Sequence, residues 1–350
     1  MEVKNAEVIS FINLKGGVGK TSATINIADA FSKDGKAVLV IDMDPQFNAT
    51  QALLNHQYRY HKKNIEQDVL VDIHKELIEK YNEVVATNTA QEEDNEEELN
   101  PDEEYKRELS SQLIYNRLKS KKITVRTLFT YEGIVEGLDN PSLIYKLKEN
   151  LDIIPGNLDL FETLTGDTSG KHNVLQDHIT EYGLRELYDY IFIDCPPNWT
   201  ILTQASLFAS DYYIIPSKVD LFSSVGIGLL ESLVNSTFYE KKSPIYTLYN
   251  VYRRELARPH IQPLGVLFTL THEITIEGKL KEKLKSKIPL EFFETEIPYH
   301  SSVPLKFSLY NESGAKHETL KNSVSRAILE IFERISLKKK EVVVNEGSGK

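Results

Sequence analysis

The residues whose types and spacing most clearly suggest a chemical function form the glycine-rich stretch KGGVGKTS at positions 15–22. Its three glycines let the backbone turn tightly, so that successive N–H groups can point at phosphate oxygens. In such a loop Lys20 would neutralise the β- and γ-phosphates of a nucleotide, and the Thr21 hydroxyl would ligate Mg²⁺. Ser22 would add a hydroxyl contact at the α-phosphate. The stretch therefore predicts a phosphate-binding loop (P-loop).

Two residues depart from the usual P-loop pattern, G-x-x-x-x-G-K-[ST]. Leu14 stands where the first glycine is expected, and a second lysine, Lys15, precedes the remaining motif. Leu14 should cost the loop little, because Gly16, Gly17 and Gly19 already supply the turns. The departure leaves the nucleotide-binding prediction intact and adds a cation to the loop.

Acidic residues follow two apolar runs of the sequence. The run YIFID ends in Asp194, at the C-terminal end of a predicted strand, which is where a doubly wound sheet holds its ligands. Asp42 and Asp44 alternate at the end of another strand, so their side chains face different directions. An acid near the γ-phosphate can orient the attacking water in phosphoryl transfer. The plainer interpretation of Asp42 and Asp44 is a strand end with solvated acids.

The segments that must position these residues are predicted to be strands and helices that alternate along the chain. Apolar runs at 7–13 and 37–42 flank helical spacing over 21–32, which makes a βαβ unit with a right-handed crossover. Further strand-like runs occur at 151–155, 190–194, 212–216, 264–269 and 292–298, most of them separated by helix-length segments. The predicted fold is α/β, with a doubly wound, mostly parallel sheet and a closing helix over 315–340.

The segment 56–149 breaks this rhythm, so we expect one domain built from 1–55 and 150–338 with a helical insertion between them. Amphipathic patterns at 65–85 and 103–120 predict a helical hairpin, and the acidic section 86–104 predicts a mobile linker at its tip. The insertion is either a solvated decoration or a partner-binding arm. The tail 339–350 is expected to be disordered.

Composition sets further bounds. The 350 residues are 41% hydrophobic and 27% charged, and no apolar run approaches the roughly 20 residues that span a bilayer. A single cysteine excludes an internal disulfide framework and suits a reducing cytoplasm. The net charge of −11 is concentrated, since residues 91–104 hold nine acids, whereas 241–350 carry 19 Lys/Arg against 13 Asp/Glu. The overall acidity therefore does not argue against DNA binding by the C-terminal third.

KGGVGKTS, DMDPQFNAT and IDCPP, in this order and spacing, resemble the deviant Walker A ATPases of the ParA/MinD superfamily. The stretches IIPGNLDL, IIPSKVDLFSSVGIGLL and EIPYHSSVPL favour its ParA branch. The resemblance covers about 1–55 and 150–338. It implies a slow, weak ATPase that uses Mg²⁺ and serves as a timer for DNA segregation in the cytoplasm, associated with the nucleoid.

The resemblance also assigns roles to residues of this chain. It implies that Lys15 reaches across a dimer interface to the partner's ATP, much like an arginine finger, and that Asp44 positions the hydrolytic water. Asp42 would lie beside the magnesium site, and Asp194 would be the Walker B acid. The implied ATP-binding residues are Lys15, Gly16, Gly17, Val18, Gly19, Lys20, Thr21, Ser22, Thr269 and Pro298, the last two at the adenine.

By the same resemblance, the ATP-bound dimer binds DNA without sequence preference, and a ParB-like centromere-binding protein stimulates hydrolysis. Such binding needs phosphate-neutralising cations rather than base readout. The candidates are Lys241, Lys242, Arg253, Arg254, Arg258, Lys279 and Lys281. The lysine run 279–287 can equally be a solvated amphipathic helix. Family members often carry arginines around 298–306, where this chain has Tyr299, His300 and Lys306. The loop at residue 15 leaves no room for an N-terminal helix-turn-helix, so operator-specific repression is not expected.

Four other functions are possible for a loop of this kind. A MinD-like, membrane-cycling ATPase would use 324–340 as an amphipathic membrane helix, although that segment is more economically the last packing helix of the domain. A nitrogenase-reductase-like role would need more cysteines, and the tyrosines are too scattered for a bacterial tyrosine kinase. A scaffold that binds ATP without hydrolysis has no need to keep Lys15, Lys20, Asp44 and Asp194 together.

Overall fold

The computed structural model describes residues 5–87, 101–130, 139–163, 165, 168, 170–300, 309–312 and 317–347. Its strands are β1 (Glu7–Phe11), β2 (Val38–Asp42), β3 (Tyr145–Lys148), β4 (Leu151–Ile154), β5 (Tyr190–Asp194), β6 (Tyr212–Ser217), β7 (Gln262–Thr271) and β8 (Ile297–Pro298). They form one sheet in the order β3-β4-β2-β5-β1-β6-β7-β8, and every pairing is parallel except that of β3 with β4.

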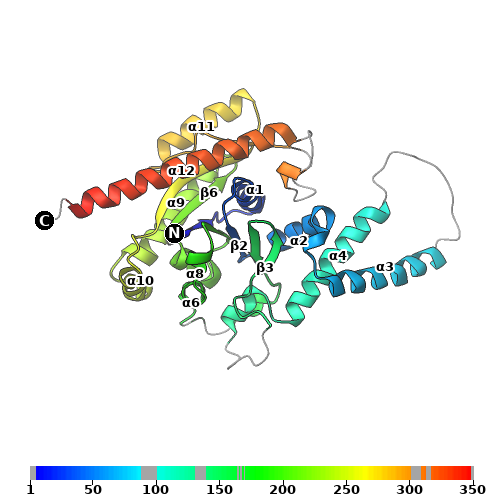
Figure 1. Cartoon of the computed structure of the whole chain (residues 1–350). Helices are drawn as coiled ribbons and strands as arrows, with labels where there is room; N and C mark the ends of the chain where they lie inside the picture. Colours follow the sequence, from blue (N-terminus) through cyan, green and yellow to red (C-terminus); the bar gives the residue numbers. More distant parts are fainter. Residues whose placement is uncertain are drawn as a thin grey trace.

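Helices cover both faces of this sheet (Figure 1). They are α1 (Lys20–Lys33), α2 (Asn48–Tyr60), α3 (Gln67–Thr87), α4 (Pro101–Ser120), α5 (Leu160–Thr163), α6 (Val174–Glu181), α7 (Leu184–Leu187), α8 (Ile201–Ala209), α9 (Ser223–Val234), α10 (Pro244–Glu255), α11 (Thr275–Lys287) and α12 (Glu318–Gly347). Short helical turns occur at η1 (Lys62–Asn64), η2 (Val125–Phe129), η3 (Asn235–Tyr239) and η4 (Tyr310–Glu312). The predicted doubly wound α/β fold is confirmed. None of the helices in the described ranges is long and apolar enough to cross a membrane.

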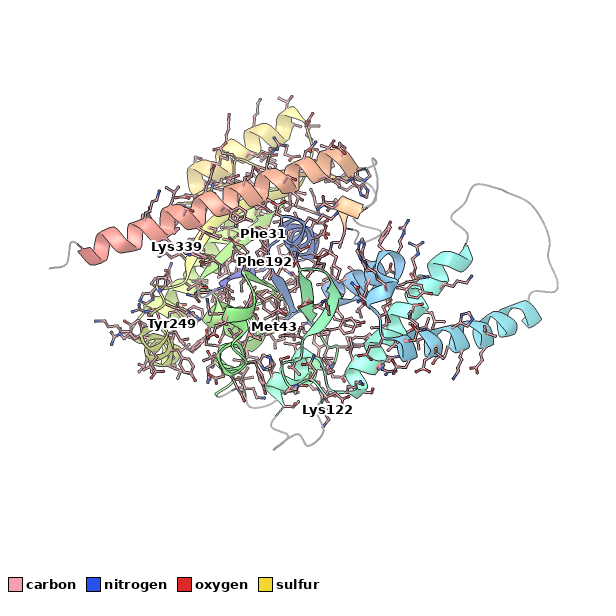
Figure 2. All side chains as sticks on the ribbon, in the orientation of Figure 1. Phe31, Met43, Lys122, Phe192, Tyr249 and Lys339 are labelled. Atoms are coloured by element: carbon pink, nitrogen blue, oxygen red, sulfur yellow. The ribbon has the colours of Figure 1, made fainter. Side chains whose placement is uncertain are left out.

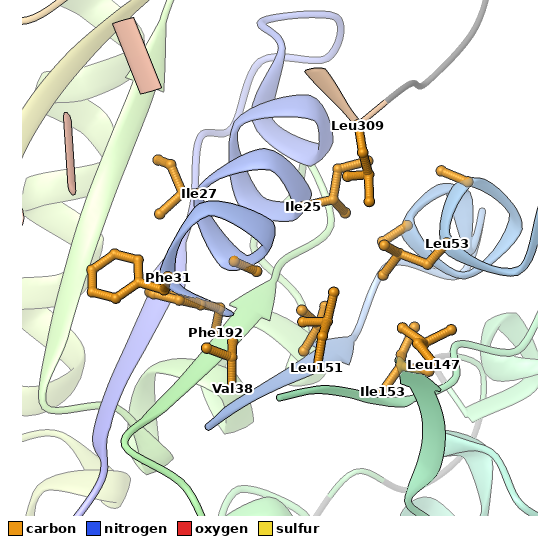
Figure 3. Close-up of a cluster of buried hydrophobic side chains, with 14 of the residues drawn as sticks. Ile25, Ile27, Phe31, Val38, Leu53, Leu147, Leu151, Ile153, Phe192 and Leu309 are labelled. Carbon is orange, nitrogen blue, oxygen red and sulfur yellow. The ribbon is translucent and has the colours of Figure 1, made fainter. Parts of the chain in front are cut away.

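The strand pleat divides the core into two layers. Ile9 and Phe11 of β1 face the layer that contains α1, α2 and α12, whereas Val8 and Ile12 face the layer that contains α6, α8 and α9. Figure 3 shows the first layer, where side chains of α1 and α2 meet those of the strands. Central strands buried on both faces are expected for a parallel sheet, and their continuous apolar runs made them recognisable in the sequence.

Phe31 of α1 and Phe192 of β5, both labelled in Figure 2, mark where α1 packs on the sheet. Their ring centroids are 5.3 Å apart, and the ring of Phe332 of α12 lies 4.8 Å from that of Phe31. Helices α1 and α12 are thereby fixed on the same side of β5. Since α1 begins in the glycine-rich loop, this contact also fixes the direction in which that loop leaves the sheet.

Three predicted element boundaries change in the structure. The expected strand at 264–269 extends over Gln262–Thr271, whereas the one at 292–298 is reduced to Ile297–Pro298 and an isolated bridge between Val266 and Phe292. The prediction that 339–350 is disordered is wrong through Gly347, where α12 ends. The reason is that 318–346 contains neither proline nor glycine, so nothing in this stretch breaks the helix.

The region predicted as an insertion contains two long helices, α3 and α4, which are neighbours and run antiparallel. Arg117 on α4 forms ion pairs with Asp68 and, at 3.4 Å, with Asp72, which lie one turn apart on α3. The predicted linker 86–104 is shorter than expected, because 86–87 and 101–104 are helical, and its centre, 88–100, lies outside the described residues. The predicted boundary at residue 55 falls inside α2, and β3 of the sheet lies within the range 56–149.

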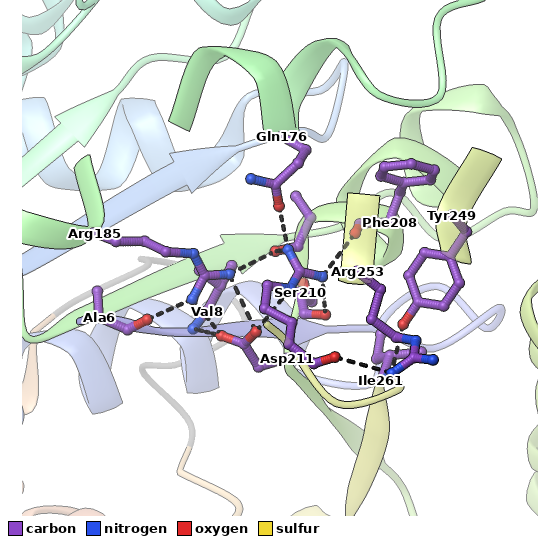
Figure 4. Close-up of polar contacts among 12 residues, drawn as sticks. Ala6, Val8, Gln176, Arg185, Phe208, Ser210, Asp211, Tyr249, Arg253 and Ile261 are labelled. Carbon is purple, nitrogen blue, oxygen red and sulfur yellow. Dashed lines mark hydrogen bonds and ion pairs between the residues drawn. The ribbon is translucent and has the colours of Figure 1, made fainter. Parts of the chain in front are cut away.

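A buried ion cluster lies at the N-terminal ends of the strands (Figure 4). Asp211, immediately before β6, receives a bidentate contact from Arg185 at 2.7 and 3.1 Å and lies 3.2 Å from Arg258. Its carboxylate also accepts the backbone N–H of Val8. Arg258 is buried and donates to the backbone carbonyls of 208, 209 and 210. The prediction that Arg258 binds DNA is therefore wrong, because its guanidinium is used inside the protein.

Candidate nucleotide-binding site

The glycine-rich loop connects β1 to α1 at the C-terminal edge of the sheet. Gly19 has φ 75° and is the residue immediately before α1. A Cβ atom at this position would lie 3.3 Å from Cγ of Leu270, so both the backbone conformation and the close packing favour glycine. Thr269 holds the loop from the other side, since its hydroxyl donates to the carbonyl oxygen of Val18. The loop is thus supported by the end of β7.

Strand register brings the acidic residues to this loop. Asp194 of β5 pairs with Phe11 of β1 on one side and with Asp42 of β2 on the other. The three strands are parallel, so their C-terminal ends coincide and their following loops share one edge. This is why residues separated by more than 170 positions in the sequence meet at one site.

Four of the predicted site residues form a buried cluster. The Thr21 hydroxyl donates to Oδ2 of Asp194 at 2.7 Å, and Nζ of Lys20 donates to Oδ1 of Asp194 at 3.2 Å. Nζ of Lys20 also lies 3.8 Å from Oδ2 of Asp44. All four side chains are buried. The P-loop lysine and hydroxyl are therefore held in place by the acids at the ends of β5 and β2.

Asp42 has a different set of contacts. Its Oδ2 accepts both the backbone N–H and the hydroxyl of Thr50, at 2.8 and 2.7 Å, so it fixes the first turn of α2. Burial, together with the charge of Asp194, raises the pKa of Asp42 to about 8. Burial also raises the pKa of Asp44, and Lys20 offsets only part of this increase. Burial would lower the pKa of Lys20, but Asp194 and Asp44 outweigh it, and its pKa is raised.

The cluster is short of positive charge, and this makes it suitable for a divalent cation. Asp44 and Asp194 face one ammonium group, that of Lys20, and Asp42 is a third acid beside Asp194. Within the described residues, no three His, Cys, Asp or Glu side chains converge on a point that could hold a metal ion by themselves. Mg²⁺ commonly keeps several waters and takes only one or two protein ligands together with phosphate oxygens. The residues therefore fit Mg²⁺ that arrives with a nucleotide.

Lys15 lies outside the buried cluster. Its side chain is 44% exposed, and Nζ contacts Oδ2 of Asp220 at 2.5 Å. The backbone of Lys15 is positioned by Asn13, whose Oδ1 accepts its N–H at 2.9 Å. Leu14 packs against the apolar core, which explains how the loop accommodates a residue other than glycine there. Beside Asp220, exposed apolar side chains gather at Leu221, Phe222, Val225 and Leu229.

The other predicted ATP contacts lie on the loop, on α1 and on the two last strands of the sheet. Gly16 and Gly17 are exposed at the turn of the loop, and Ser22 is buried in the first turn of α1. Thr269 is buried with its hydroxyl directed at the loop, and Pro298 is half-buried on β8, where it pairs with Thr271. Their assignment to the adenine stays a prediction.

The predicted DNA-binding cations divide into two groups. Lys241, Lys242, Arg254 and Lys279 are exposed. Lys281 is largely enclosed, and its Nζ lies 2.6 Å from Glu296 and 3.5 Å from Glu277. Arg253 donates to Asn250 and to the carbonyl oxygen of Arg258, so it ties α10 to the loop that follows it. Together with buried Arg258, these contacts leave the exposed group as the better candidates.

Two site residues were missed by sequence reasoning. Thr50 lies eight residues after Asp42 in the first turn of α2, where its N–H and hydroxyl donate to Asp42, and no local pattern marks it as part of the site. Asp220 had no local signal, because it is 205 residues from Lys15. Only the placement of β6 beside β1 brings the two together.

The fold and the site define a P-loop nucleotide-binding protein: a glycine-rich loop between β1 and α1, with a buried lysine, a hydroxyl and a strand-end acid. The chain belongs to the AAA domain family, whose model matches residues 6–245. It is of the ParA/MinD type, as the sequence motifs predicted.

Individual proteins support this placement. An uncharacterized Mycobacterium tuberculosis protein is 28% identical over 78% of this chain and 61% of its own length. The sporulation initiation inhibitor protein Soj of Bacillus subtilis is 26% identical over 65% of this chain and 64% of its own. This chain therefore covers less than two thirds of both relatives. A Borrelia burgdorferi protein assigned to plasmid partition, bound to AMPPNP, has the same fold, with a TM-score of 0.55, 22% identity and coverage of 96% of this chain and 100% of that chain.

Proposed function

We propose that this protein is a DNA-partition ATPase: ATP drives a sandwich dimer that binds DNA without sequence preference, and a ParB-like partner stimulates hydrolysis. The observation that carries the proposal is the combination of a buried catalytic-type cluster with an exposed second lysine. Lys20, Thr21, Asp44 and Asp194 lie together at the loop, while Lys15 lies on the open side of the same loop. The similarity to Soj supports the proposal.

Within the site, each residue has a distinct task. Lys20 holds the terminal phosphates, and Asp194 keeps its ammonium group and the Thr21 hydroxyl oriented through hydrogen bonds of 3.2 and 2.7 Å. Asp44, whose Oδ2 lies 3.8 Å from Nζ of Lys20, orients the attacking water. Mg²⁺, when bound, would supply the positive charge that this acidic cluster lacks. Asp42 acts mainly by fixing Thr50 and the start of α2.

Dimerisation is supported by the surface around Lys15. An exposed lysine that has only to exchange Asp220 for a phosphate can reach a nucleotide held by a second copy. The neighbouring apolar side chains include Phe222, which is 74% exposed. Exposed apolar patches of this kind are typical of interaction sites, and a two-fold dimer would bury the same patch on both copies.

DNA binding is supported by exposed cations on α10 and α11 and on the turn between η3 and α10. Arg254, Lys279, Lys241 and Lys242 are available to phosphates, since their side chains are exposed. Contacts of this kind neutralise phosphates without reading bases, so affinity should fall steeply as salt increases. Sequence preference is not expected.

The test compares the parent protein with Lys15→Gln and Asp44→Ala in assays of ATP turnover, ATP-dependent dimerisation and DNA retention, each with and without a ParB-like partner. We expect Lys15→Gln to retain ATP binding and to lose the ATP-dependent dimer or its hydrolysis. Normal dimerisation and turnover of Lys15→Gln would refute the role of that lysine across the interface. ATP-dependent pelleting with liposomes, without DNA retention, would favour a membrane-cycling ATPase instead.

A further inference from the structure

The loop that carries Asp44 ends in an unusual backbone conformation. The Asp44 side chain accepts the N–H of Gln46 at 3.0 Å, and its carbonyl oxygen accepts the N–H of Phe47 at 2.8 Å, which closes a tight turn. Phe47 then has φ 41° and ψ 36°, immediately before α2. This left-handed conformation is unfavourable for a residue with a bulky side chain. Contacts outside the turn must therefore hold Phe47 in place.

Two such contacts enclose Phe47. On one side lies Gly156, where a Cβ atom would come within 2.8 Å of Cβ of Phe47, so the backbone after β4 approaches as closely as sterics allow. On the other side lies Tyr115 of α4, whose ring stacks on that of Phe47 with centroids 4.7 Å apart and planes inclined by 8°. Aromatic pairs of this geometry are attractive beyond the area that they bury.

Tyr115 lies where α4 packs against α2. Its neighbour Ile114 on α4 is buried in the same core layer as Leu53 of α2. Figure 1 shows α4 crossing α2 and continuing outward beside α3. At the base of this hairpin, Arg117 fixes α4 to α3 through its ion pairs with Asp68 and Asp72. A displacement of the hairpin would therefore reach Phe47 through Tyr115.

We propose that Tyr115 is a positioning residue for the nucleotide site, through which the α3–α4 hairpin sets the position of Asp44. The path runs from Tyr115 to Phe47 by ring stacking, from Phe47 to Asp44 by the turn, and from Asp44 to Lys20 at 3.8 Å. The inference deepens the proposed function and rests on it for the role of Asp44 in hydrolysis. It gives the inserted hairpin a task that solvated decoration would not have.

The experiment uses the full chain and three variants. Tyr115→Leu removes the ring stack with Phe47, and Tyr115→Phe keeps it. Leu118→Ala weakens the packing of α4 in the same core layer, at a residue about one helical turn from Tyr115 that forms no ring contact with Phe47. We expect Tyr115→Leu to lower kcat for ATP by about tenfold or more, because small displacements of positioning groups have large effects on rate. KM for ATP should stay within about twofold, since Lys20 and the loop are untouched. Tyr115→Phe and Leu118→Ala should retain kcat.

Hydrogen exchange gives a second readout that does not need turnover. The amides of Gln46, Phe47 and Thr50 donate to Asp44 and Asp42, so exchange of a peptide over 44–51 reports the turn. It should accelerate at least threefold in Tyr115→Leu and remain unchanged in Leu118→Ala. If the parent protein does not hydrolyse ATP, the proposed function fails, whereas the exchange data still decide whether Tyr115 positions the turn.

Several outcomes would overturn the inference. Equal losses of kcat in Tyr115→Leu and Leu118→Ala would show that general packing of α4 is what matters. Unchanged kcat and exchange in Tyr115→Leu would show that the stack does not act on Asp44. Where Tyr115→Leu fails to fold, Phe47→Leu removes the other ring of the same pair and should give the same loss of kcat and faster exchange; parent-like behaviour of this variant would also refute the proposal.

Discussion

Two buried clusters of charged residues lie at opposite ends of the same parallel strands, and they differ in their balance of negative and positive charges. At the N-terminal ends, one carboxylate, Asp211, faces two guanidinium groups, those of Arg185 and Arg258. At the C-terminal ends, the carboxylates of Asp44 and Asp194 face one ammonium group, that of Lys20. The first cluster is complete within the chain, whereas the second has charge left for a ligand.

The pKa directions follow this difference. Burial alone would raise the pKa of Asp211, but Arg185 and Arg258 outweigh it and hold the pKa below its usual range. Burial and neighbouring acids instead raise the pKa of Asp42 to about 8, and burial raises that of Asp44. A buried acid whose pKa is raised in a loop-lined site is typical of function, while a saturated ion cluster is typical of structure.

The largest expected effect comes from breaking the complete cluster. Asp211→Ala would leave the buried guanidinium group of Arg258 and the partly buried one of Arg185 without their counter-ion, and loss of one partner of a buried pair costs about 3–5 kcal/mol. We expect a decrease of that size in the free energy of unfolding, measured by chemical denaturation. Asp34→Ala, at the exposed end of α1, is the control and should change it by less than about 0.5 kcal/mol. A loss below about 1 kcal/mol at Asp211 would contradict the structural assignment.

The same kind of substitution at the other end should act on rate rather than stability. Asp44→Ala removes one of the two carboxylates that face Lys20, so the protein should unfold no more easily than the parent. ATP turnover should fall by about 10²–10⁴-fold, the usual range for loss of a positioned acid or base. Gln46→Ala changes an exposed neighbour in the same turn and should retain turnover. Turnover of Asp44→Ala within twofold of the parent would refute its assigned role.

Binding of Mg²⁺ and ATP should balance the charges of the cluster around Lys20, as the arginines balance Asp211 in the other cluster. Mg²⁺ and ATP at about 100 times Kd should stabilise the parent protein by about 2.7 kcal/mol, because the ligand binds only the folded state. Lys20→Ala should lose most of this stabilisation when both are followed by thermal unfolding with and without nucleotide. An equal upward shift in both proteins would mean that the nucleotide binds elsewhere.

A further expected effect is a difference in pH dependence between the two ends. Asp42 in the folded protein titrates near pH 8, whereas an unfolded aspartate titrates near 3.9, so between these values only the folded state keeps the proton. Stability should therefore fall as pH rises through this window, by at most about 1.4 kcal/mol per pH unit. Asp211, with its lowered pKa, contributes stability above the unfolded value that is lost as pH falls.

Asp42→Asn isolates this contribution. The free energy of unfolding should fall less between pH 5 and pH 8 in the variant than in the parent, because the variant has no carboxyl group to deprotonate. Its side-chain oxygen can still accept the hydrogen bonds of Thr50. Urea unfolding of both proteins at the two pH values provides the measurement. Parallel pH curves for parent and variant would show that Asp42 is already ionised at neutral pH.

Much of the fold and of the site was readable from local sequence. Buried parallel strands such as 190–194 are continuous apolar runs. The glycines of the loop indicate its backbone conformation, because glycine tolerates positive φ. The charged residues were less predictable. Arg258 and Lys281 read as exposed cations, but one is buried against Asp211 and the other lies between Glu277 and Glu296.

The sequence by itself determined the class of protein, because a phosphate-binding loop needs only one short segment with the right conformational freedom and side chains. Tertiary structure decided which charges remain for a ligand. Lys15 meets Asp220, Asp42 is engaged by Thr50, and the ring of Tyr115 closes on Phe47 only because strand order and helix packing bring distant segments together. Electrostatic balance depends on distances across the fold, and no pattern of neighbouring residues encodes them.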